Sequence, residues 1–283
     1  MPTHRDKEAY QLYMRARKLW RSKIAWQLTR QETLTILHDV EHAAQAGDWG
    51  ARALMAHFYL YGLGPLDSNH VLDPAPDKAI ELVRKAIAAG QAWGYYDLGV
   101  AYEQGHGGVE YDADMAWAYY RKAAELGSPE AQMALASVYK RAKRSDAAEA
   151  MIICAHMQGH GPAAYKLGMR AENYKRFRTA IAFYQDGIKF GHKDSADSLM
   201  LIFDSNVWNR QTRADQDEYR RLELKPDAER SRRYDQIGDA LAINPDLRLS
   251  RLDKVLPLPP AEVPPWNGIE DAIEPEPSGP PRY

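Results

Sequence analysis

Two histidines stand four residues apart in the segment His38-Asp-Val-Glu-His42, and this spacing is the strongest catalytic signal in the chain. It matches the pattern H-x-x-E-H, in which two histidines on one helical face hold a zinc ion and the glutamate acts as general base. In the repeat register described below, however, His42 shares its position with Lys85 and Lys122, which is a solvent position. We therefore interpret both histidines as surface residues and predict no metal site.

The other candidates for chemistry are equally isolated. Cys154 is the single cysteine, which excludes an intramolecular disulfide and a cysteine-rich zinc site. It shares the repeat position of Lys85 and Lys122, and no His–Asn or His–Asp arrangement around it is recognisable. Gly105-His-Gly-Gly108 lacks the preceding strand and the following Gly-Lys-Ser/Thr of a phosphate-binding loop. We expect a protein that is not an enzyme and binds no cofactor.

Composition narrows the class of protein further. The 283 residues carry 37 basic and 39 acidic side chains, a net charge of −2, which excludes the basic surface of a non-specific nucleic-acid binder. The mean hydropathy of −0.58 and the absence of an apolar run of about 18 residues exclude a membrane span. Residues 1–30 lack the apolar stretch of a secretory signal.

A repeat with a period of 32 to 43 residues organises most of the sequence. Five runs rich in small residues each close on a glycine, called here the register glycines: Gly47, Gly90, Gly127, Gly159 and Gly191. The residues four before and four after each glycine are small, and the residue seven before it is apolar or aromatic. Such spacings lie on one helical face and let two helices approach closely. We predict five helix–turn–helix units in which the glycine ends the first helix.

These patterns predict five segments along the chain. Residues 1–30 form an amphipathic capping helix with a basic face, for which contact with a membrane surface or an acidic partner is the alternative. Residues 31–205 hold the five repeats, and residues 206–245 form C-terminal helices. Residues 246–268 form an extended, proline-rich hook, and residues 269–283 form a disordered acidic tail.

Three motifs carry a resemblance to a known family: Gly94-Tyr-Tyr-Asp-Leu-Gly99, Tyr102-Glu-Gln-Gly105 and the segment Asp114–Gly127. They resemble the Sel-one-like repeat, a relative of the tetratricopeptide repeat with a longer loop between its helices. The resemblance implies an all-α fold, an α-solenoid of helical hairpins.

The C-terminal region resembles one bacterial subgroup of that family. The similar residues are Arg230-Ser-Arg-Arg-Tyr234, Leu252–Pro260 and Pro264-Pro-Trp-Asn-Gly268. Members of the subgroup are often lipoproteins or periplasmic proteins encoded beside type VI secretion effectors, including phospholipase toxins. The resemblance implies an immunity protein that binds its cognate toxin. It favours the periplasm. The sequence as written lacks a lipobox cysteine, and the alternative expectation is the cytoplasm if this sequence is complete.

Analogy with tetratricopeptide repeats also implies which residues meet the partner. The inner helical face would hold the residues 3, 6, 10, 13 and 14 positions after each register glycine. From these we predict a partner-binding surface made of His57, Tyr61, Trp93, Tyr96, Glu103, Met133, Lys140, Arg141 and Tyr165. Exposed aromatic residues with a charged margin are typical of protein-binding surfaces. The alternative is that several of them pack against neighbouring helices or under the hook.

The sequence therefore leads to two functional hypotheses. The first is an immunity protein that blocks a type VI effector by covering its active site. The second is a scaffold or adaptor of the bacterial envelope or secretion machinery. Neither requires nucleic acid or a small-molecule substrate, and membrane contact would need a lipoprotein anchor outside this sequence.

Overall fold

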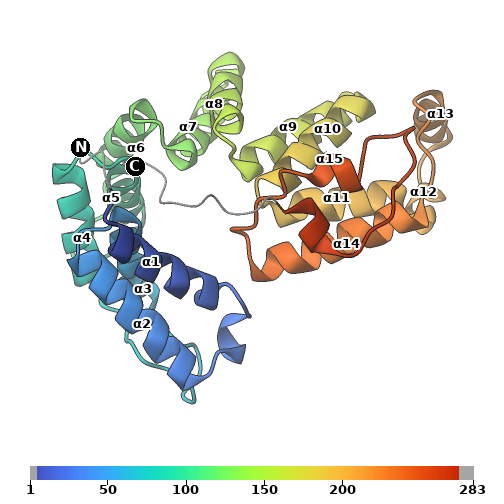
Figure 1. The fold of residues 1–283 in the computed structure, drawn as a ribbon. Helices are drawn as coiled ribbons and strands as arrows, with labels where there is room; N and C mark the ends of the chain where they lie inside the picture. Colours follow the sequence, from blue (N-terminus) through green and yellow to red (C-terminus); the bar gives the residue numbers. More distant parts are fainter. Residues whose placement is uncertain (1–4, 274–283) are drawn as a thin grey trace. The chain divides into compact units, whose positions relative to one another are not determined.

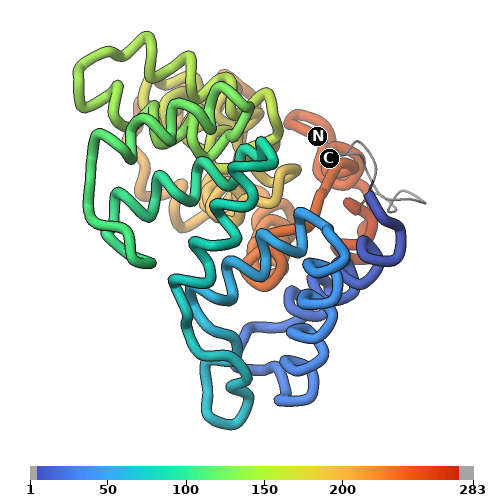
Figure 2. Tube along the Cα trace, turned by 90° about the vertical axis from the view of Figure 1, so that its left-hand side faces the viewer, coloured from blue at the N-terminus to red at the C-terminus, as the bar shows by residue number. Residues whose placement is uncertain are grey.

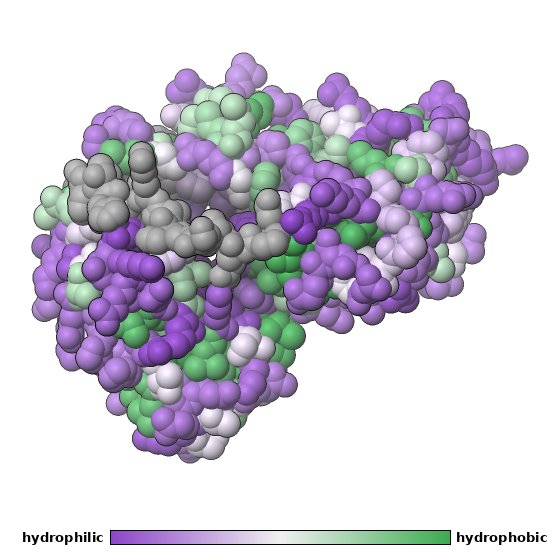
Figure 3. Space-filling view, viewed as in Figure 1, coloured by the Kyte–Doolittle hydropathy of each residue, from purple (hydrophilic) through white to green (hydrophobic). Residues whose placement is uncertain are grey.

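The computed structural model describes residues 5–273, and its regular structure is helical (Figure 1). No strand occurs within this part of the chain, where an isolated bridge pairs Leu63 with Leu72. Among the same residues, no helix is long and apolar enough to span a bilayer. On the face drawn in Figure 3, hydrophilic side chains predominate and hydrophobic ones form smaller patches. The predicted all-α solenoid of helical hairpins is confirmed.

The described chain divides into two compact units, with the boundary between Ala148 and Glu149. Unit 1 contains the first seven α-helices and one 3-10 turn: α1 (Lys7–Trp20), η1 (Ala25–Gln27), α2 (Arg30–Gln45), α3 (Trp49–Tyr61), α4 (Pro76–Ala88), α5 (Ala92–Gln104), α6 (Ala113–Glu125) and α7 (Pro129–Arg141). Each helix packs on the next one in the chain, so α1 covers α2 and the hairpins follow in order. Figure 2 traces this back-and-forth path from blue to green.

Unit 2 begins within α8 (Ser145–Met157), which spans the boundary between the units. Its remaining elements are α9 (Gly161–Asn173), α10 (Phe177–Lys189), α11 (Lys193–Phe203), α12 (Ser205–Trp208), α13 (Arg213–Arg221), α14 (Ala228–Ile243), α15 (Leu252–Val255) and η2 (Ile269–Ala272). Helices α9, α10 and α11 continue the hairpin pattern, and α14 packs on α11. The core of this unit is built around Tyr184, Tyr234 and Ile237.

All five register glycines lie between two helices and have positive φ angles between 73° and 100°. A residue with a Cβ rarely adopts this conformation, so the glycine lets the chain leave one helix and enter the next. The small residues four positions before the first four glycines are completely buried: Ala43, Ala86, Ala123 and Ala155. A Cβ on Gly94 would lie 2.7 Å from that of Ala86, which shows how closely α4 and α5 approach. The predicted register and its physical cause are confirmed.

The C-terminal segment differs from the prediction because it is built into the core of unit 2. Residues 246–268 include the short helix α15, and only the part beyond it is extended. Residues 269–273, predicted to be disordered, include the 3-10 turn η2 with Ala272 fully buried. Apolar side chains such as Trp266 and Ile269 pack on the core, which explains why the segment is ordered. Residues 274–283, the rest of the predicted acidic tail, lie outside the described residues.

Two buried arginines of α14 hold this C-terminal segment in place. The guanidinium of Arg233 donates to the carbonyl oxygens of Val255 (2.9 Å) and Pro264 (2.7 Å) and to a carboxylate oxygen of Glu229 (2.7 Å). Arg230 donates to the carbonyl oxygens of Pro257 and Ala261. Because a proline-rich segment offers carbonyl groups but few N–H donors, arginine side chains are suitable partners for it.

Candidate protein-binding groove

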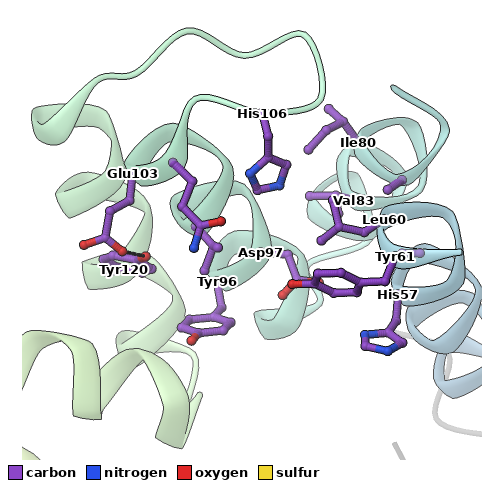
Figure 4. A pocket seen from close by; sticks show the side chains of 14 residues that line it. His57, Leu60, Tyr61, Ile80, Val83, Tyr96, Asp97, Glu103, His106 and Tyr120 are labelled. Atoms are coloured by element: carbon purple, nitrogen blue, oxygen red, sulfur yellow. Dashed lines mark hydrogen bonds between the residues drawn. The ribbon is translucent and has the colours of Figure 1, made fainter. Parts of the chain in front are cut away.

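A groove in unit 1 opens between α3, α4 and α5 and has a volume of about 380 Å³ (Figure 4). Its lining comes from these helices, from α6 and from the loop after α5: Ala56, His57, Leu60, Tyr61, Ala79, Ile80, Val83, Tyr96, Asp97, Val100, Glu103, Gln104, His106 and Tyr120. The volume lies in the range of sites that hold a ligand or a side chain of a partner. No lysine or arginine is among these lining residues.

Local sequence signals fix the helices around the groove. Asp48 caps α3, where its side chain accepts a hydrogen bond from the backbone N–H of Ala51 (2.9 Å). Pro76 opens α4 at a position where a helix needs no backbone donor. Asp112 caps α6 and accepts from the backbone N–H groups of Asp114 and Met115, each at 3.0 Å. The lining residues of α3, α4 and α6 therefore lie on helices whose first residues are set by these local signals.

The floor of the groove is apolar. Ala79, Ile80 and Val83 are buried and belong to the hydrophobic face of α4. Ile80 and Val83 form one core cluster with Leu98 of α5. Because these side chains anchor α4 to α5, the base of the groove is part of the folded core of unit 1.

One wall is built from a tyrosine–tyrosine–glutamate triad on α5 and α6. The hydroxyl of Tyr120 donates a hydrogen bond of 2.6 Å to a carboxylate oxygen of Glu103, and the rings of Tyr96 and Tyr120 lie 5.6 Å apart. Burial and this hydrogen bond raise the pKa of Tyr120. The Tyr120 ring rests on the backbone of Gly99, where an added Cβ would lie 2.8 Å from the ring. The triad thus keeps the carboxylate of Glu103 in a defined place at the groove.

The groove also contains the carboxylate of Asp97. No group among residues 5–273 makes a hydrogen bond or an ion pair with it. Its side chain is half-buried and points into the space between α3 and α5 (Figure 4). Desolvation, together with the negative charge of Glu130, raises the pKa of Asp97 from 3.8 to about 7. At neutral pH this carboxyl group is therefore only partly ionised.

The opposite wall carries two aromatic rings of α3. Tyr61 is 65% exposed, and its ring lies 4.8 Å from that of His57. His57 also contacts Trp20, with the ring centres 5.4 Å apart. Desolvation by these contacts and the nearby charges of Arg21 and Arg17 lower the pKa of His57, so its ring is neutral at pH 7.

The same triad recurs in unit 2 at the same repeat positions. The hydroxyl of Tyr184 donates a hydrogen bond of 2.7 Å to Glu172, and the rings of Tyr165 and Tyr184 lie 5.8 Å apart. Gly168 corresponds to Gly99, because a Cβ added to it would lie 2.5 Å from the Tyr184 ring. The position of Asp97, seven residues after the register glycine, is held in unit 2 by Lys166, which is exposed. The triad is thus a repeated structural device, whereas the unpaired carboxylate belongs to unit 1.

The structure brings four of the predicted partner-binding residues together: His57, Tyr61, Tyr96 and Glu103 line the groove. The other five lie elsewhere. Met133 is 9% exposed and belongs to the buried core, so its prediction as a surface residue is wrong. Its repeat position is the one held by Tyr96 and Tyr165, which are half-buried and whose rings contact Tyr120 and Tyr184 of the next helix.

The remaining predicted residues have mixed surroundings. Trp93 is half-buried against the core cluster of α4 and α5, and its indole N–H is buried without an acceptor among the described residues. Lys140 and Arg141 are exposed at the end of α7. Tyr165 belongs to unit 2, where it is half-buried between the rings of Tyr184 and His192.

Among the lining residues that were not predicted, three have titratable side chains: Asp97, His106 and Tyr120. Tyr120 is the aromatic residue seven positions before Gly127, and its ring is buried while its hydroxyl bonds to Glu103 at the groove. The sequence carries one signal for Asp97. The positions seven after the other register glycines hold Leu54, Ala134, Lys166 and Ser198, so Asp97 is the acidic exception.

The residues with possible metal or nucleophile chemistry lie on the surface. His38 and His42 are exposed, and their ring centres lie 4.2 Å apart. Cys154 is exposed as well. Within residues 5–273, no three histidine, cysteine, aspartate or glutamate side chains come close enough to hold a metal ion.

Comparison with known families identifies the repeats. Residues 50–91 and 94–128 match the Sel1 repeat, and residues 195–277 match a family described as a domain of unknown function (DUF6396). The chain therefore contains Sel1 repeats, as its resemblance to the Sel-one-like repeat predicts. No curated protein sequence matches the chain.

Solved structures from Pseudomonas aeruginosa are similar over almost the whole chain. PA5086 is 28% identical, with a TM-score of 0.70 over 91% of this chain and 90% of its own. The immunity protein Pa5087 is 26% identical, with a TM-score of 0.69 over 91% and 90% of the two chains. The immunity protein PA5088 is also 26% identical, with a TM-score of 0.66 over 92% and 91%. Together with the Sel1 repeats, these neighbours point to a solenoid that binds proteins.

Proposed function

We propose that this chain is an immunity protein that binds a cognate effector of a type VI secretion system and neutralises it by covering the active site. The observation that carries the proposal is the match to two immunity proteins over at least nine-tenths of each chain, at 26% identity. The choice of a type VI effector, with a phospholipase as the first candidate, follows the sequence resemblance of the C-terminal residues. The periplasm is the proposed place of the encounter.

The groove of unit 1 is the proposed centre of the contact. It joins an exposed aromatic residue, Tyr61, with the half-buried Tyr96 and the carboxylates of Asp97 and Glu103. Tyrosines contribute large contact areas at low cost in conformational entropy and are frequent hot spots of binding. A stable inhibitory complex would bury about 800 Å² on each partner, so the groove would be the core of a larger contact.

The test is co-expression with the effector encoded beside this chain in its genome. We expect the effector alone to stop growth of a bacterial host and the chain, co-expressed in the same compartment, to restore it. Isothermal titration calorimetry should then give a one-to-one complex of the two purified proteins. Binding without protection would contradict the immunity role and favour the scaffold or adaptor alternative. Failure of both binding and protection would contradict the proposal altogether.

A further inference from the structure

We infer that the groove of unit 1 receives a lysine or arginine side chain of the partner, whose cationic group pairs with the carboxylate of Asp97. The inference deepens the proposed function and rests on it, because it names the chemistry that the partner presents. The proposed pairing involves the one partner side chain that enters the groove.

The carboxylate of Asp97 is energetically unfavourable in the folded chain. A half-buried carboxylate without a donor loses hydration and gains no hydrogen bond in return. Glu130 of α7 adds a second negative charge, which disfavours ionisation further and raises the pKa of Asp97 to about 7. The folded chain therefore maintains an unfavourable electrostatic arrangement that a cation in the groove would relieve.

The charged side chains that line the groove favour a cation. Its lining includes the carboxylates of Asp97 and Glu103 and neither lysine nor arginine. His57 does not compensate, because desolvation and the nearby arginines Arg17 and Arg21 lower its pKa. An anionic group would be repelled, and an apolar group would desolvate Asp97 without pairing it. Charge complementarity selects a cation.

The floor and walls of the groove suit a long basic side chain. Ile80 and Val83 provide an apolar floor along which the methylene groups of a long basic side chain can lie. The rings of Tyr61 and Tyr96 provide aromatic faces for the cationic head. The carboxylate of Glu103, which accepts a hydrogen bond of 2.6 Å from the Tyr120 hydroxyl, offers a second acceptor for the cation. Lysine and arginine both combine an apolar stem with a cationic donor, so both fit this arrangement.

Binding of a cation must also be coupled to pH. A partner cation favours ionised Asp97, so affinity falls when the solution is acidified below its free-state pKa of about 7. Helix α4 contributes no titratable side chain to the groove. The titratable groups that face Asp97 from the surrounding elements are His57 and Tyr61 of α3, Tyr96 and Glu103 of α5, His106 of the following loop, Tyr120 of α6 and Glu130 of α7. Protonation of His57 in acid would weaken cation binding in the same direction.

The first experiment uses small cations and needs no effector. Butylammonium and butylguanidinium are titrated into the full chain, with butanol and sodium chloride as controls, while NMR follows the ¹³C-labelled carboxyl group of Asp97. We expect the organic cations to lower the pKa of Asp97 and to perturb the Tyr61 ring, and to leave this ring unperturbed in Asp97→Asn. Identical titration curves with the cations and with the controls would overturn the inference.

The second experiment measures affinity for the effector at pH 8 and pH 6. Asp97→Asn should weaken binding about 10- to 100-fold at pH 8 and reduce the difference between the two pH values. The matched control is Lys166→Gln, at the same repeat position in unit 2, which should stay within about twofold of wild type.

The outcomes separate the inference from the proposed function. Equal affinity of wild type and Asp97→Asn would overturn the inference and leave the immunity role intact. Absence of effector binding by the wild type would overturn the immunity role, and the small-cation titration would then decide the chemistry of the groove. Thermal unfolding of each variant verifies that a loss of binding is not a loss of fold.

Discussion

The two units of the chain contain the same triad in different surroundings. In unit 1, Tyr120 and Glu103 form one wall of a groove beside the unpaired Asp97. In unit 2, Tyr184 makes the same hydrogen bond to Glu172, but the corresponding residue is the exposed Lys166. The triad is therefore shared by the two hairpins, whereas the residue at the position of Asp97 differs between them.

The half-buried Asp97 of unit 1 also contrasts with buried polar groups of unit 2 that have partners. In unit 2 the amide of Gln185 donates to the Tyr234 hydroxyl (3.0 Å) and to the carbonyl oxygen of Leu256 (2.6 Å). Arg230 and Arg233 are buried and bonded to the C-terminal segment. Paired polar groups of this kind stabilise one arrangement of the chain. An unpaired one such as Asp97 costs stability and is typical of a binding site.

The largest effect is expected from removing an anchor of unit 2. Arg233→Ala leaves the carbonyl oxygens of Val255 and Pro264 without a donor and should lower the free energy of unfolding by about 3 kcal/mol. The matched control is Arg232→Ala, which also loses a bond to Glu229 but removes an exposed side chain, so its effect should be below about 1 kcal/mol. Chemical denaturation measures both variants, and equal losses would contradict the role of burial.

A smaller effect of opposite sign is expected in unit 1. Asp97 has a pKa of about 7 in the folded chain and 3.8 as its ordinary value. Between these pH values the folded state binds the extra proton, so stability decreases as the pH rises and the full penalty is present above pH 7. Asp97→Asn should raise the free energy of unfolding by about 2 kcal/mol at pH 8 and leave it unchanged at pH 4.

The value of about 2 kcal/mol is lower than the full pKa difference would give, because water reaches part of the carboxylate. Denaturation of wild type and Asp97→Asn across this pH range provides the measurement. Lys166→Asn in unit 2 serves as the control and should show no such pH dependence. A stability difference for Asp97→Asn that is the same at pH 4 and pH 8 would contradict the desolvated carboxylate.

The smallest effect on stability is expected from cutting the triad hydrogen bond in each unit. Tyr120→Phe and Tyr184→Phe each remove one hydrogen bond to a glutamate and should lower the free energy of unfolding by about 1 kcal/mol. Only Tyr120→Phe should also weaken effector binding, because it releases Glu103 at the groove. Denaturation and calorimetry on both variants give the comparison, and weaker binding by Tyr184→Phe alone would reverse it.

The repeat could be predicted from the sequence because its physics is local. Each hairpin needs a glycine with positive φ and small residues at close helix contacts, so these residues recur periodically in the sequence. All five register glycines have the predicted role. The groove was only partly predictable. Periodicity assigns a residue to a helical face, but it does not give the degree to which that face is buried. Met133 was therefore wrongly predicted to be exposed.

The chemistry of the groove was harder still to predict. The pKa of Asp97 depends on desolvation by neighbouring helices and on Glu130, which is 33 positions further along the chain. Such a contact leaves no trace in the spacing of the residues. The order of the C-terminal segment likewise depends on Arg230 and Arg233, whose carbonyl partners follow 22 to 31 residues later.

The most direct test of the protein-binding groove compares two exposed tyrosines of unit 1. Tyr61 lines the groove and is 65% exposed, whereas Tyr111 lies in the loop between α5 and α6, outside the groove lining, and is 69% exposed. Isothermal titration calorimetry with the proposed effector should show binding at least about tenfold weaker for Tyr61→Ala and within about twofold of wild type for Tyr111→Ala. Equal affinities of the two variants would contradict the groove as the centre of the contact.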